Sequence, residues 1–147
     1  MGHAVPVLAT SNMKPVSLKP SLRKQQRIDT LLNIKVTDRR GKIYLCEAIN
    51  ISRAGMMISC DPKLATQLLP DARSPAPGQG IEALVEFALP VDASQTVRIT
   101  AACQIVHLRR ISRTEFHIGI RFDSFEDNGY DCLEQYISRC FAERAIG

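Results

Sequence analysis

Residues 116–122 read Phe-His-Ile-Gly-Ile-Arg-Phe, and this stretch decides the fold class of the chain. Large apolar side chains occupy positions 116, 118, 120 and 122, while histidine, glycine and arginine lie between them. Successive side chains of a β-strand point to opposite faces, so this alternation predicts a strand with one buried face. An α-helix would instead place its apolar residues three and four positions apart.

The same period of two recurs toward the N-terminus, and turn residues separate the repeats. Strands are predicted over residues 28–36, 43–51, 56–59, 81–89 and 96–108. Prolines punctuate residues 61–80, so we expect a long connection there with one helical turn at 63–69. Antiparallel strands joined by short turns close most simply into a barrel, which leaves no exposed edge. We therefore predict an all-β fold, a six-stranded antiparallel β-barrel followed by a C-terminal helix.

The two ends of the chain differ from this strand pattern. Apolar residues recur at helical spacing near the C-terminus, at Leu133, Tyr136, Ile137, Cys140 and Phe141. They predict an amphipathic helix over about 127–144 that packs on one barrel opening or on a partner. Residues 1–20 hold three prolines and no apolar periodicity, so we expect a flexible N-terminal tail before a single domain over 21–147.

Length and composition indicate one globular domain. The chain has 147 residues, of which 45% are hydrophobic and 23% charged. It contains no apolar run long enough for a membrane span or a signal peptide. Its five cysteines are odd in number and lack the spacing of a zinc site, so we expect reduced thiols and no metal. These features predict a cytoplasmic protein without membrane insertion.

Positive charge gathers near the start of the predicted domain. Residues 21–45 carry seven basic side chains against Asp29 and Asp38, which leaves this window at +5, whereas the whole chain is at +4. Such an uneven distribution predicts an anionic partner.

The sequence offers no set of catalytic residues. Its three histidines are His3, His107 and His117, and none has an acidic pair beside it in the sequence. Nucleophile-elbow, zinc-protease and phosphate-loop motifs are all missing from the sequence. We therefore expect that the protein is not an enzyme.

Two short motifs carry groups suited to a nucleotide. Arg23 and Arg27 lie four residues apart just before the first predicted strand, and a guanidinium donates in pairs to phosphate or to the guanine edge. Further on, Asn50, Ser52 and Gly55 combine an amide, a hydroxyl and a residue that permits a sharp turn. Each motif alone also has a plain structural interpretation.

Together, in this order, the motifs resemble the PilZ family of cyclic di-GMP receptors. That family has RxxxR before its first strand, matched by Arg23 and Arg27, and then (Asp/Asn)-x-Ser-x-x-Gly, matched by Asn50, Ser52 and Gly55. The resemblance extends over residues 21–141. It also includes segments similar to the family's middle, long and closing strands, at 81–90, 99–107 and 119–122.

The resemblance implies a six-stranded PilZ-type barrel that binds cyclic di-GMP on its surface. It implies that Arg23 and Arg27 hold guanine and phosphate, and that Asn50 and Ser52 contact the second guanine and fix the turn, with Gly55 as the backbone requirement. His107 lies about where some members place a side chain against a base. No other cofactor is implied. A bacterial receptor of this kind relays the second-messenger signal through a ligand-ordered arginine segment to a protein effector, which the sequence does not identify.

Two other functions remain open from the residues. The barrel could be a protein-interaction module that binds no ligand. It could also bind single-stranded nucleic acid, although such a surface needs a platform of aromatic side chains, and this chain has no tryptophan. We therefore expect no nucleic-acid partner.

Overall fold

The computed structural model describes residues 13–15, 26–71 and 73–146. In this part of the chain, seven strands and two helices follow one another. The strands are β1 (Met13–Pro15), β2 (Ile28–Thr37), β3 (Ile43–Ile51), β4 (Gly55–Cys60), β5 (Ile81–Pro90), β6 (Thr96–Arg110) and β7 (Phe116–Glu126). The helices are α2 (Pro62–Leu68) and α3 (Gly129–Ile146).

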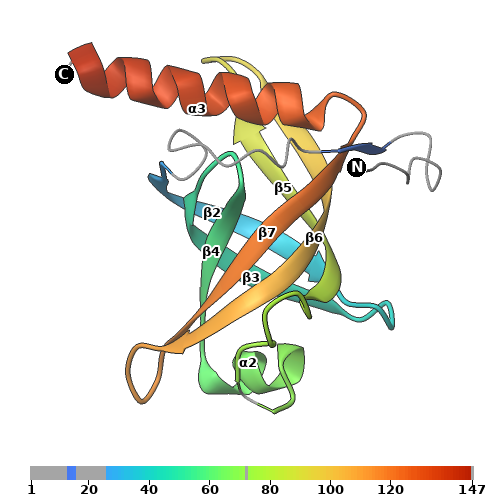
Figure 1. The fold of residues 1–147 in the computed structure, drawn as a ribbon. Coiled ribbons are helices and arrows are strands. Elements are labelled where there is room, and N and C mark those ends of the chain that lie inside the picture. Colours follow the sequence, from blue (N-terminus) through green and yellow to red (C-terminus); the bar gives the residue numbers. More distant parts are fainter. Residues whose placement is uncertain (1–12, 16–25, 72, 147) are drawn as a thin grey trace.

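Six of the strands close into an antiparallel barrel. Their order around it is β7-β4-β3-β2-β5-β6, and the pairing of β6 with β7 completes the circle. Strand β1 adds to the other edge of β7, where Met13 lies opposite Glu126. Figure 1 shows α3 across one end of the barrel and α2 near the other. The predicted barrel and C-terminal helix are confirmed.

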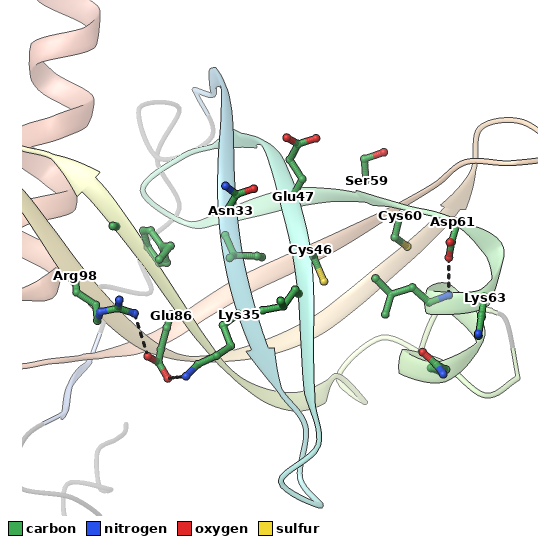
Figure 2. A pocket seen from close by; sticks show the side chains of 16 residues that line it. Asn33, Lys35, Cys46, Glu47, Ser59, Cys60, Asp61, Lys63, Glu86 and Arg98 are labelled. Carbon is green, nitrogen blue, oxygen red and sulfur yellow. Dashed lines mark hydrogen bonds and ion pairs between the residues drawn. The ribbon is translucent and has the colours of Figure 1, made fainter.

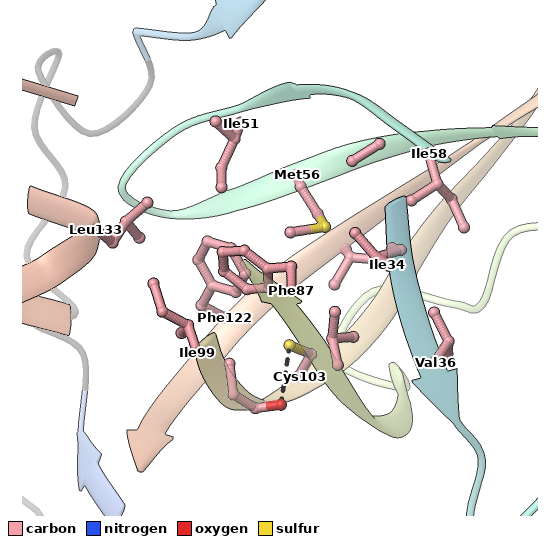
Figure 3. Packing of buried hydrophobic residues seen from close by; sticks show 14 of the residues in the cluster. Ile34, Val36, Ile51, Met56, Ile58, Phe87, Ile99, Cys103, Phe122 and Leu133 are labelled. Atoms are coloured by element: carbon pink, nitrogen blue, oxygen red, sulfur yellow. Dashed lines mark hydrogen bonds between the residues drawn. The ribbon is translucent and has the colours of Figure 1, made fainter. Parts of the chain in front are cut away.

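The barrel interior is filled by the apolar residues of each alternating strand. In the stretch that predicted the fold, Ile118, Ile120 and Phe122 are buried, as the period of two requires. Phe122 packs between two other rings, with centroids 6.1 Å from Phe87 and 5.0 Å from Phe125. Figure 3 shows side chains from opposite strands meeting in this interior. Each large apolar side chain contributes about 1.5–3 kcal/mol by leaving water.

Helix α3 shares this core. Its Leu133 and Ile137 side chains are fully buried and belong to the same cluster as the barrel residues. They lie four positions apart, which places them on one face of a helix. The observed helix begins two residues later and ends two residues later than the predicted 127–144.

Two local features differ from the sequence-based picture or refine it. Helix α2 confirms the helical turn expected at 63–69, and the Asp61 side chain caps it by accepting from the backbone N–H of Leu64. Strand β1 lies inside the segment expected to be a flexible tail and was not predicted. A strand of three residues is too short to show any periodicity.

None of the helices in the described ranges has the length and apolar character needed to cross a membrane.

Candidate ligand-binding site

The turn between β3 and β4 is organised by Ser52. Its side chain is 1% exposed, and its hydroxyl oxygen accepts hydrogen bonds from the backbone N–H groups of Ala54 and Gly55, at 3.2 Å each. The backbone N–H of Ser52 donates to the carbonyl of Gly55 at 2.8 Å, which closes the turn. Ser52 therefore fixes the shape of the loop that follows Asn50, one of the two roles that the family resemblance implies for it.

Gly55 is required because β4 runs very close to β7 at this point. A Cβ atom built on Gly55 would collide with the carbonyl oxygen of Ile120 and lie 3.0 Å from its carbonyl carbon. Both atoms belong to the backbone, so no rotamer change could make room. The neighbouring Ala54 carbonyl accepts from the N–H of Phe122 at 2.8 Å, which holds the turn against β7.

Arg27 joins the first motif to the second. It lies just before β2 and is exposed, and its Nη1 donates to Oδ1 of Asn50 at 2.8 Å. Asn50 is half-buried near the end of β3, directly opposite Asp29 of β2. The structure thus brings Arg27 and Asn50 together on the barrel surface, beside the turn that Ser52 and Gly55 shape.

Arg23 lies outside the described residues. The remaining predicted site residue, His107, is exposed on β6.

A single row of residues across four strands connects Asn50 to His107. Asn50 pairs with Met57 of β4, Met57 pairs with Gly119 of β7, and Gly119 pairs with His107. Neighbouring strands are about 4.8 Å apart, so His107 lies about 14 Å from Asn50 along the barrel surface. His107 is therefore not part of the Arg27–Asn50 cluster. Met57 and Gly119 lie between Asn50 and His107 in this row.

The turn also contains a buried cation that sequence reasoning did not single out. Arg53 is 5% exposed, and its guanidinium donates to Glu134 of α3 through Nε (2.6 Å) and Nη2 (3.0 Å). Nη2 also lies 3.3 Å from the Ser138 hydroxyl. The hydrogen bonds with Glu134 raise the pKa of Arg53 above its ordinary value, so Arg53 stays charged. Glu134 lies far from Arg53 in the sequence, so no local sequence pattern could predict this ion pair.

A groove lies elsewhere on the barrel (Figure 2). It has a volume of about 920 Å³, and none of the described site residues lines it. Glu86 pairs there with Lys35 at 3.3 Å and Arg98 at 3.5 Å, which leaves its charges largely compensated. Burial raises the pKa of the Cys46 thiol to about 12, and that of Cys60 to about 11.

These thiols are therefore protonated at neutral pH and poor nucleophiles. Among the described residues, no cluster of three histidine, cysteine, aspartate or glutamate side chains could hold a metal ion.

Comparison with known families identifies the family of the chain. The model of the PilZ domain matches residues 21–139, which is most of the chain. The chain belongs to the PilZ domain family, whose members are generally cyclic di-GMP-binding effector modules. No curated protein matches the chain.

The chain matches solved structures to different extents. The Bacillus subtilis inhibitor of motility (MotI/DgrA) has a TM-score of 0.58 and 14% sequence identity, over 81% of this chain. The match covers 49% of that protein, so the chain spans about half of its length. The PilZ domain of CeSA from a cellulose-synthesising bacterium has a TM-score of 0.39 and 13% identity, over 81% of this chain and 98% of that one.

Proposed function

We propose that this chain is a cyclic di-GMP receptor without catalytic activity, and that it passes the signal to a protein partner. The observation that carries the proposal is the hydrogen bond between Arg27 and Asn50. It brings one arginine of the first family motif against the first residue of the second motif, on an exposed part of the barrel surface.

The chemistry of this cluster suits the ligand. Cyclic di-GMP presents two phosphates and two guanine edges, which are acceptors for a guanidinium. Arg27 has five N–H donors, so it can keep its bond to Asn50 while it donates to a phosphate or to guanine. Asn50 then orients the arginine before the ligand arrives, which lowers the entropy lost on binding.

Arg23 is proposed to complete the site. It is four residues from Arg27, so a fully extended chain limits their separation to about 14 Å. In our proposal, the ligand draws residues 20–26, which precede the Arg27–Asn50 contact, against the barrel and thereby changes the surface offered to a partner. His107 would be reached only by a ligand that extends along the Met57–Gly119 row.

The cysteines and exposed apolar residues are consistent with this function. All five cysteines are free thiols, as expected for a cytoplasmic receptor. The large exposed hydrophobic side chains in the described part of the chain are all aliphatic. They provide no aromatic platform for single-stranded nucleic acid.

Titration calorimetry with cyclic di-GMP, with GTP as the control nucleotide, tests the proposal. We expect saturable binding of cyclic di-GMP only, and the stoichiometry will distinguish one ligand from a stacked pair. No heat, together with an unchanged melting temperature at high ligand concentration, would instead favour a PilZ module that binds proteins alone.

Limited proteolysis tests the ordering step. Trypsin cleaves after arginine and lysine, so Arg23, Lys24 and Arg27 report directly on this segment. We expect saturating cyclic di-GMP to slow cleavage there. Equal cleavage rates with and without ligand would contradict an ordering switch.

A further inference from the structure

The binding turn is attached to helix α3 by its own arginine. Arg53 lies between Ser52, which shapes the turn, and Ala54, whose carbonyl accepts a hydrogen bond from the N–H of Phe122 on β7. Its guanidinium reaches α3 and donates to both carboxylate oxygens of Glu134. A bidentate, charge-assisted pair fixes orientation as well as distance. The backbone of the turn is therefore held in a defined position relative to the helix.

The pair forms part of a small network on α3. The Ser138 hydroxyl donates to Glu134 at 3.2 Å and lies 3.3 Å from Arg53 Nη2. Ser138 follows Glu134 by one helical turn, so all three groups meet on one side of the helix. Because Arg53 is buried, a displacement of Glu134 would leave its charge without this carboxylate in a site poorly reached by water. Such a displacement is strongly unfavourable.

A second contact links α3 to the other half of the candidate site. The Tyr136 hydroxyl lies 3.5 Å from the hydroxyl of Thr30, three residues after Arg27 on β2. This is a weaker contact than the Arg53–Glu134 pair. The segment with Arg27 and the turn that follows Asn50 thus both contact the same part of α3, between residues 134 and 138.

We propose that Arg53 and Glu134 are positioning residues for cyclic di-GMP binding, and that ligand binding is coupled through them to helix α3. The inference rests on the proposed function. A turn held against α3 keeps Asn50 in place to orient Arg27, which raises ligand affinity. Coupling between two sites is reciprocal, so a ligand that tightens the turn also tightens the attachment of α3. Helix α3 then becomes the element that presents the bound state to a partner.

The test compares two single-charge variants of α3 by titration calorimetry with cyclic di-GMP. Glu134→Gln keeps one oxygen acceptor but removes the charge that faces Arg53. Glu143→Gln removes the same charge from the same helix at an exposed position that pairs only loosely with Arg139, at 4.0 Å. We expect about tenfold weaker binding for Glu134→Gln, and affinity within about twofold of wild type for Glu143→Gln. Circular dichroism and the melting temperature report whether each variant is folded.

Hydrogen exchange in the wild-type protein gives a readout that a merely structural pair would not change. We expect cyclic di-GMP to slow exchange of the backbone amides at residues 132–140. Unchanged exchange there would overturn the inference, even if Glu134→Gln failed to fold. Wild-type affinity in folded Glu134→Gln would overturn it as well, and would leave Arg53–Glu134 a pair that only stabilises the fold.

These outcomes separate the inference from the proposed function. If wild-type protein does not bind cyclic di-GMP, the proposed function fails and the inference fails with it. If wild-type protein binds but the Glu134→Gln variant binds equally well, the receptor function stands and only the coupling is wrong.

Discussion

The guanidinium of Arg27 donates to the side-chain oxygen of Asn50 over 2.8 Å, although the two residues are 23 positions apart in the sequence. Arg27 precedes the first barrel strand and Asn50 lies near the end of the next, and the antiparallel register brings Asp29 opposite Asn50. The turn between β2 and β3 is thus far from this contact. The pairing of the whole hairpin, rather than any local segment, creates the candidate site.

Replacement of either motif arginine is predicted to remove ligand binding without unfolding the protein. A hydrogen bond to a charged group contributes about 1.5–3 kcal/mol, so Arg27→Ala should weaken cyclic di-GMP binding at least about tenfold. We expect Arg23→Ala and Arg27→Ala each to abolish binding measurable by calorimetry at micromolar ligand. Arg98→Ala is the matched control, since its side chain is 71% exposed and lies in the other groove. Micromolar affinity retained in both motif variants would contradict the site assignment.

Gly55→Ala is predicted to destabilise the barrel strongly. The added methyl would collide with the backbone of Ile120, and we expect a loss of about 3 kcal/mol or more in the free energy of unfolding. Gly41→Ala provides the comparison. Gly41 has open space around it but a φ of +87°, so only backbone strain of about 1–2 kcal/mol is expected. Urea unfolding measures both, and a smaller loss at Gly55 than at Gly41 would refute the steric argument.

Ser52→Ala is predicted to cost about 1–3 kcal/mol of stability, because it leaves two N–H groups of a buried turn without their acceptor. The Ser112 hydroxyl accepts the same kind of hydrogen bond, from the backbone N–H of Thr114, but in an exposed loop. Water can replace that hydroxyl, so Ser112→Ala should change stability by no more than about 0.5 kcal/mol. Thermal and urea unfolding of both variants check the contrast, and equal effects would mean that burial of the turn is unimportant.

Stability is predicted to fall at alkaline pH through the half-buried thiols. Burial raises the pKa of Cys46 to about 12 and that of Cys60 to about 11, from an ordinary value of 9.0. Their contribution is fully present below about pH 9. Above it, the unfolded chain releases protons that the folded chain keeps, so the free energy of unfolding falls toward about pH 12.

The Cys46→Ala variant isolates this effect from the other groups that titrate at alkaline pH. Urea unfolding under reducing conditions, between pH 7 and pH 10.5, should show a flatter pH dependence for Cys46→Ala than for wild type. Identical slopes would show that Cys46 does not contribute.

The barrel could be predicted from sequence because the pattern that identifies each strand lies within a few consecutive residues. Alternation such as that of residues 116–122 reports which face of a strand is buried, and Ile118 and Ile120 are indeed inside. The resemblance to the PilZ family implied that the two motifs share a site, and Arg27 and Asn50 are in contact.

The contacts that depend on closure of the barrel could not be predicted. The distance of His107 from Asn50 follows from the strand order around the barrel, which alternation does not specify. A charged residue in a turn, such as Arg53, is normally expected to be exposed to solvent. Arg53 is nevertheless buried, because α3 lies over it and provides Glu134. Burial of a charge depends on a distant partner, and periodicity contains no information about that partner.

Strand β1 has a consequence for the arginine segment. Pro15 is paired with Ser124 on β7, and Ile28 is paired with Ile51 on β3, so both ends of the chain between them are fixed to the barrel. The entropy of loop closure is lost when the barrel folds and not when the ligand binds, and it grows only slowly with loop length. A ligand that binds beside Arg27 therefore does not have to lose this closure entropy again.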